Sequence, residues 1–128
     1  MEAPIDMDSE DLVKLIIEEC DRRKTDDIVV YDVRGASSLT DFYLLCSGNS
    51  TTQLRAIQGY IEKALHEVGI VPRSVEGTAA SQWILVDYND VLVHIFLKST
   101  RELYNVEELL DEHRRFYPEV ASEGVAAV

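Results

Sequence analysis

Apolar residues recur every three or four positions in two long segments of the chain, which predicts two amphipathic helices. The first begins near Asp8 or Ser9, either of which can cap a helix, and runs through about residue 24. The second is better defined, because Ser50 opens a capping box and Gly69 provides a left-handed stop. Both segments carry one apolar face, so each is expected to cover a sheet.

Shorter runs with β-branched or alternating apolar residues predict strands between and after these helices. We expect strands over residues 28–33, 42–46, 73–76, 82–87 and 91–97. The run 42–46 is continuously apolar, which is typical of a central strand covered on both faces. The last two strands form a hairpin that turns at residues 88–90. A final short helix is expected to open at Asn105, with apolar residues at Val106, Leu109 and Leu110.

The order of predicted elements is α-β-β-α-β-β-β-α, which indicates the α/β (α+β) class with helices packed on a mixed sheet. The length of 128 residues suits a single domain, which we place at residues 1–116. Residues 117–128 are small and polar, so we expect a frayed tail.

The predicted hairpin is apolar on both faces, although only two long helices are available to cover the sheet. Along its second arm, Val93 and Ile95 point to one face while His94 and Phe96 point to the other. Two interpretations stay open. Either the short helix and loops complete the cover, or part of one face is left exposed for a partner.

The formal net charge is -12, and the acidic residues are concentrated near both ends of the chain. Residues 22–101 hold nine acidic and nine basic residues, so the centre is balanced. This distribution argues against direct, sequence-specific binding of nucleic acid, which needs a basic stripe. No apolar run is long enough to span a membrane, and no signal or transit segment is recognisable at the start. We therefore expect a cytoplasmic protein.

Few residues have the spacing that catalysis or metal binding requires. His66, His94 and His113 show no metal-ligand spacing, so no metal or cofactor is expected. Cys20 and Cys46 are interpreted as two buried thiols in a reducing compartment, with a disulfide as the less favoured alternative.

The turn from Ser47 to Ser50 could hold an anion, but it lacks a recognised glycine pattern and is favoured as a tight turn with a helix cap. A nucleotidyltransferase would add two acids at positions i and i+2 of one strand to hold magnesium. The available acids, Asp87 and Asp90, are instead three apart and separated by a turn. The chain therefore has the character of such a scaffold without its catalytic pair, and we predict no enzyme activity. A nucleotidyltransferase or nucleotide-binding protein using Gly48, Ser50, Asp87 and Asp90 remains the alternative.

Several motifs in order resemble the ribosomal silencing factor family, also called Iojap-related proteins. The resemblance covers about residues 26–110 and departs from the family at Leu110 and Asn89. The motifs are Asp32-Val33, Ser37-Ser38-Leu39-Thr40-Asp41-Phe42, Ser47-Gly48-Asn49-Ser50, Val75-Glu76-Gly77, the run from Trp83 to Phe96, and the run from Arg101 to Leu109.

The resemblance implies a nucleotidyltransferase-like fold without transferase activity. It also implies a translational repressor that binds the large ribosomal subunit through ribosomal protein L-fourteen and sterically blocks joining of the small subunit. Organellar relatives also assist maturation of the large subunit, and the lack of a recognisable transit segment favours the bacterial-type role here. A third interpretation, independent of the resemblance, is a homodimer that pairs through the exposed hairpin. The residues expected to contact the partner are mostly aromatic or apolar, with polar support: Trp83, Tyr88, Leu92, His94, Phe96, Asp41, Glu76 and Arg101.

Overall fold

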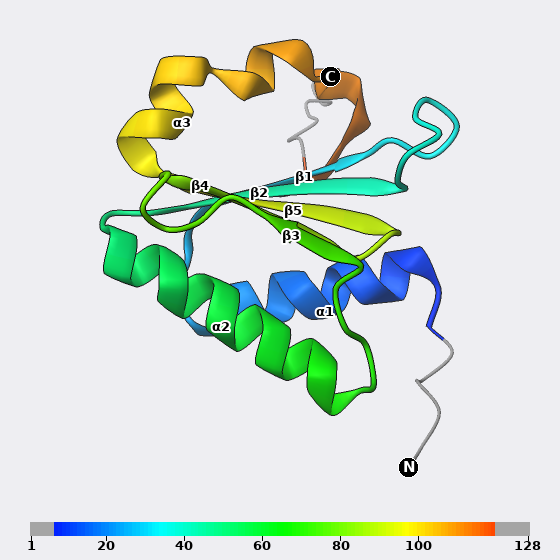
Figure 1. Cartoon of the computed structure of the whole chain (residues 1–128). Helices are drawn as coiled ribbons and strands as arrows, with labels where there is room; N and C mark the ends of the chain where they lie inside the picture. The colour runs from blue at the N-terminus through cyan, green and yellow to red at the C-terminus, as the bar shows by residue number, and fades with distance from the viewer. Residues whose placement is uncertain (1–6, 120–128) are drawn as a thin grey trace.

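The computed structural model describes residues 7–119, which form a mixed sheet with helices on both of its sides (Figure 1). The two long helices and the central strands lie close to their predicted positions. The elements in chain order are α1 (Ser9–Arg22), β1 (Asp26–Asp32), β2 (Phe42–Gly48), α2 (Thr51–Glu67), β3 (Ser74–Glu76), β4 (Trp83–Asp87), β5 (Val91–Leu97), α3 (Lys98–Tyr104), the 3-10 helices η1 (Val106–Leu109) and η2 (Glu112–Arg114), and β6 (Arg115–Tyr117).

The strands lie in the order β3-β4-β5-β2-β1-β6. β2 and β5 pair in parallel in the middle of the sheet, and the other neighbouring strands pair antiparallel. The central position of β2 explains its continuous apolar run, because both of its faces are covered. The expected fold class, a mixed sheet with packed helices, is confirmed.

Both long helices start at the side-chain caps that the sequence predicts. The Asp8 carboxylate accepts a hydrogen bond from the Asp11 amide at 2.8 Å, and the Ser50 hydroxyl accepts one from the Gln53 amide at 3.1 Å. Each bond satisfies a backbone donor that the helix itself leaves free. Gly69, at φ 83°, follows the end of α2 in the left-handed conformation that glycine adopts readily.

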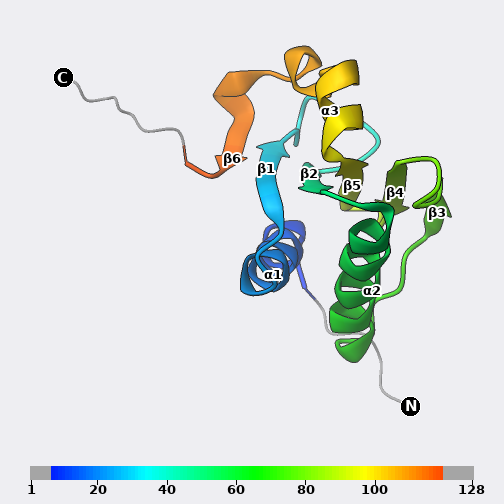
Figure 2. The same cartoon turned by 90° about the vertical axis from the view of Figure 1, so that its left-hand side faces the viewer.

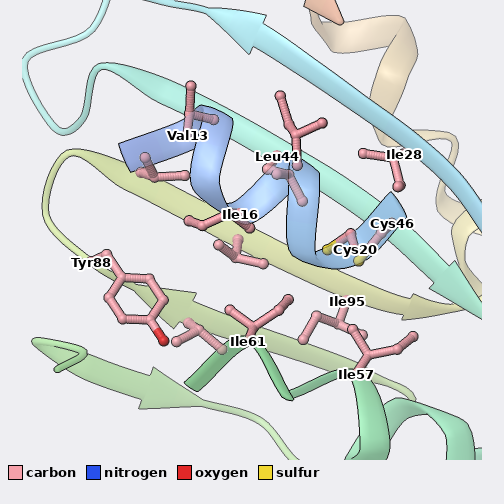
Figure 3. Packing of buried hydrophobic residues seen from close by; sticks show 14 of the residues in the cluster. Val13, Ile16, Cys20, Ile28, Leu44, Cys46, Ile57, Ile61, Tyr88 and Ile95 are labelled. Carbon is pink, nitrogen blue, oxygen red and sulfur yellow. The ribbon is translucent and has the colours of Figure 1, made fainter. Parts of the chain in front are cut away.

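α1 and α2 cover the same face of the sheet, and the main core lies between them and the strands (Figure 2). Figure 3 shows Ile16 of α1 and Ile57 and Ile61 of α2 among the strand residues of this core. Cys20 and Cys46 are free and fully buried there, as predicted. Burial and a hydrogen bond with Cys20 both raise the pKa of the Cys46 thiol, with the hydrogen bond the larger cause.

The chain after β5 crosses the opposite face of the sheet before it returns to the edge as β6 (Figure 1). We call residues 98–114, which include α3, η1 and η2, the crossing segment. Val106 and Leu110 of this segment pack against a second, smaller cluster formed by Tyr31, Val33, Leu45 and Phe96. The helices therefore do not share one face, and this second face has the thinner cover.

The structure corrects the expectation for residues 98–117 in three ways. The segment 98–104 is helical, and Asn105 ends this helix in a left-handed conformation (φ 48°) rather than capping the next helix with its side chain. Leu109, one of the apolar residues assigned to the expected final helix, has 85% of its surface exposed. Tyr117 belongs to β6 and pairs with Val30 of β1, so the sheet extends one residue past residue 116. The rest of the predicted tail, residues 120–128, lies outside the described residues.

Candidate partner-binding surface

Aromatic rings gather on the second face of the sheet, beside the start of the crossing segment. The register pairs Trp83 with Phe96 on neighbouring strands, so their side chains leave the same face of the sheet. Their ring centroids lie 4.7 Å apart, and Tyr104 of α3 lies 5.7 Å from Trp83 on its other side. Phe96 has no exposed area, whereas Trp83 is half-buried and Tyr104 is 59% exposed. The cluster therefore extends from the interior to the surface.

His94 links this cluster to the middle of the sheet. Its ring is stacked on Phe96 at an interplanar angle of 9° and meets the edge of Tyr43. The indole Nε1–H of Trp83 donates a hydrogen bond to His94 Nδ1 at 3.1 Å. Burial lowers the pKa of His94 to about 4, so the imidazole is neutral at physiological pH.

Two of the hollows on this face have residues of the aromatic cluster among their lining. The larger, of about 530 Å³, runs between the loop at Val33–Ser37 and the crossing segment, with Tyr43, Leu92 and His94 among its lining residues. The smaller, of about 340 Å³, is lined by Glu76, Gly77, Ser81, Trp83 and Leu85. Both are predominantly apolar, and both are open to solvent.

The crossing segment adds exposed apolar side chains, of which Leu109 lines the larger hollow and Leu103 precedes Tyr104 in α3. Leu103 and Leu109 are 78% and 85% exposed, values that are high for leucine in an isolated domain. With Trp83, Leu92, His94 and Tyr104, they make up what we call the open face. Contiguous exposed apolar surface of this kind is typical of an interaction site.

Arg101 attaches the crossing segment to the sheet through hydrogen bonds and an ion pair. Arg101 is 6% exposed, and its guanidinium forms a bidentate ion pair with Glu107 at 3.0 and 2.8 Å. It also donates to the Asp27 carbonyl at 2.7 Å and to the Ser47 hydroxyl at 2.8 Å. The hydrogen bonds from Arg101 lower the pKa of Glu107. This one side chain therefore ties α3 and η1 to β1 and β2.

The structure brings together some of the predicted contact residues and separates others. Trp83, Leu92 and His94 share the open face, and Glu76 lies beside Trp83 on the rim of the smaller hollow. Phe96 lies beneath Trp83 with no exposed area, so its role is packing.

The remaining three predicted contact residues lie elsewhere. Tyr88 is 5% exposed and belongs to the core under the long helices, on the opposite side of the sheet. Arg101 is buried, and its side chain bonds to Glu107, Ser47 and Asp27 within the protein. Asp41 lies at the end of the sheet next to Asp90, outside both hollows.

Sequence reasoning missed Tyr43, Leu103, Tyr104 and Leu109 as surface residues. The alternation of faces along the strand could have predicted an outward Tyr43, but the continuous apolar run 42–46 was interpreted as buried on both faces. Leu103, Tyr104 and Leu109 lie in the last family-like motif, yet the pattern assigned no face to Leu103 or Tyr104.

The alternative nucleotide site does not assemble. Gly48 and Ser50 lie at the end of β2, whereas Asp90 lies at the start, where its carbonyl accepts from the Phe42 amide. The seven residues of β2 separate the two groups by about 20 Å. Asp87 is engaged by Arg73 at 2.7 Å. Within residues 7–119, no group of three or more His, Cys, Asp or Glu side chains could hold a metal ion.

Comparison with known proteins places these features in a family. The family model described as "Ribosomal silencing factor during starvation" matches residues 6–127. A ribosomal silencing factor of Halalkalibacterium halodurans is 36% identical over 93% of this chain and 98% of its own length. That of Bacillus subtilis is 38% identical over 80% and 87%. A crystal structure of a Chromobacterium violaceum protein superimposes with a TM-score of 0.77 at 28% identity, covering 94% of this chain and all of that one.

The fold is that of a small α+β protein with exposed apolar side chains on one side of its sheet. The chain belongs to the ribosomal silencing factor family. That family is named for a regulatory role. None of the helices within residues 7–119 combines the length and apolar character needed to cross a membrane.

Proposed function

We propose that the chain represses translation by binding the large ribosomal subunit with its open face. The contact is made with ribosomal protein L-fourteen, and the bound protein sterically blocks joining of the small subunit. The observation that carries this proposal is the set of exposed apolar side chains on this side of the sheet: Leu109 lines the larger apolar hollow, and Leu103 precedes Tyr104 in α3. Family membership supplies the ribosome as the partner.

The charges around the open face favour a basic protein partner. Exposed Glu76 and Asp111 line the two hollows, and carboxylates at a rim steer a basic partner toward the contact. Large apolar side chains at the centre with charges at the rim match the usual anatomy of a protein–protein interface.

Co-sedimentation with purified large subunits tests the binding, and sucrose gradients of mixed subunits test the block of joining. We expect the wild-type protein to pellet with large subunits and to lower the yield of joined ribosomes. The double variant Leu103→Ser, Leu109→Ser is expected to bind at least tenfold more weakly, because exposed anchors at an interface contribute about 1–2 kcal/mol each. Its melting temperature stays within a few degrees of wild type, since both side chains are exposed.

Val71→Ser is the matched control. Val71 is 63% exposed but lies in the link between α2 and β3, away from the open face. Its substitution should leave both assays unchanged. Equal loss of binding in Val71→Ser and in the double variant would contradict the assignment of the open face. Wild-type binding to large subunits that lack L-fourteen would contradict the named partner.

A further inference from the structure

The proton of neutral His94 has a defined position because of its neighbour. An indole nitrogen can only donate a hydrogen bond, so the bond from Trp83 Nε1 requires an unprotonated Nδ1 on His94. The neutral ring must then carry its proton on Nε2. Stacking on Phe96 and contact with the edge of Tyr43 hold the plane of the ring.

The Nε2–H group points away from Trp83, because the two ring nitrogens lie on opposite sides of the carbon between them. His94 lines the larger hollow together with Leu92 and Tyr43. Within residues 7–119, no side chain or backbone group bonds to Nε2. A half-buried donor of fixed direction therefore remains available in the larger hollow, which we call the groove from here on. Leaving such a donor unpaired in a closed interface is costly, so an occupant must supply an acceptor.

We propose that His94 Nε2–H is the polar recognition point of the groove and binds a carbonyl oxygen of a polypeptide segment of the partner. Trp83 acts as a positioning residue, since its indole selects the histidine tautomer that donates into the groove. This inference rests on the proposed function and adds the chemistry that the partner must present at one point of the open face.

The groove favours a polypeptide over RNA as its occupant. Its floor consists of Leu45, Leu92, Tyr43 and His94, which suits an apolar side chain next to a main-chain carbonyl. A neutral imidazole offers a phosphate no charge, and Asp111, which also lines the groove, would repel it. Arg114 also lines the groove, but its guanidinium donates hydrogen bonds to the carbonyl oxygens of Asp32 and Arg34 and is thus engaged within the protein.

The tautomer is tested first in the free protein, by long-range proton–nitrogen NMR of histidine labelled with nitrogen-15. We expect the Nδ1 resonance of His94 to be that of an unprotonated nitrogen and Nε2 that of a protonated one. Trp83→Phe removes the indole donor but keeps an aromatic ring, and should give a mixture of tautomers. A protonated Nδ1 in the wild-type protein would overturn the inference before any partner is added.

Binding to isolated large subunits is then compared for two histidine replacements. His94→Asn places an oxygen where Nδ1 accepts from Trp83, but its shorter side chain has no donor at the position of Nε2. His94→Gln reaches that position with an amide donor. We expect His94→Asn to weaken binding at least fivefold, and His94→Gln to stay within about threefold of wild type, with both variants folded by thermal melting.

Each remaining outcome decides a separate question. Equal affinity of His94→Asn and wild type would overturn the role of Nε2–H while leaving the proposed function intact. Failure of the wild-type protein to bind large subunits would refute the proposed function itself. Equally tight binding to protein-free large-subunit RNA would overturn the choice of a polypeptide occupant. The Asn and Gln variants binding equally weakly would show that ring stacking, rather than the donor, carries the contribution of His94.

Discussion

Replacing Arg101 by methionine tests how firmly the crossing segment is attached to the sheet. The substitution keeps much of the side-chain volume but removes every bond to Glu107, Ser47 and the Asp27 carbonyl. Removing one partner of a buried ion pair usually costs about 3–5 kcal/mol. We expect about 3 kcal/mol, the lower end, because the Glu107 side chain is 34% exposed and can regain water. For a chain of 128 residues this corresponds to a melting temperature about 10 °C lower.

Urea unfolding of Arg101→Met and of a matched control measures this cost. Arg73→Met removes an ion pair of similar length, 2.7 Å to Asp87, from a side chain that is 61% exposed. Surface pairs contribute at most about 1 kcal/mol, so this control should be nearly as stable as wild type. The double variant Arg101→Met, Glu107→Leu should be more stable than the sum of its single changes predicts, because no carboxylate is left unpaired. An Arg101→Met protein as stable as Arg73→Met would refute the reasoning.

Three further predictions concern local features of the fold. Gly77→Ala should cost at least about 2 kcal/mol in urea unfolding, because Gly77 has φ 79° and a Cβ there would lie 2.2 Å from the Trp83 carbonyl oxygen. Its control, Gly59→Ala at an open position of α2, should stabilise the protein by about 0.5–1 kcal/mol. Equal effects of the two substitutions would contradict this reasoning. Ser50→Ala should cost about 1 kcal/mol through loss of the α2 cap, and no change in melting temperature would show that the cap contributes nothing. The pKa of His94 is about 4 in the folded protein and about 6.5 when unfolded, so its contribution to stability is full above pH 6.5 and is lost as the pH falls toward 4. His94→Phe should therefore lose less unfolding free energy than wild type between pH 7 and pH 4.5. Identical slopes of unfolding free energy against pH would contradict the assignment.

The elements with regular apolar spacing could be predicted from the sequence, because their apolar residues do face the core. The cap at Ser50 and the alternation along residues 91–97 are examples, and both appear in the structure as expected. α3 reverses this rule. Its buried residues are Thr100 and Arg101, while Leu103 and Tyr104 face outward. A search for apolar faces therefore does not find it.

The candidate site could be predicted only where strand alternation determines it. Trp83 and His94 fall on one face because each strand alternates and the hairpin sets their register. The partners of Arg101 could not be predicted, since Ser47 and Asp27 lie more than fifty residues away along the chain. Tyr88 misled for a related reason: a tyrosine next to a turn is usually accessible, but this ring turns inward under the helices.

The pairing of β6 with β1 also has a consequence for how the protein is made. β1 is synthesised early, but the strand that covers its outer edge consists of residues 115–117, near the end of the chain. Until these residues emerge, the nascent chain presents free amide and carbonyl groups along β1, next to Val30 and Tyr31. Such an edge is a template for pairing with other chains. Incomplete products that end before Arg115 are therefore left with an open strand that favours aggregation, and residues 115–117 protect the complete chain from it.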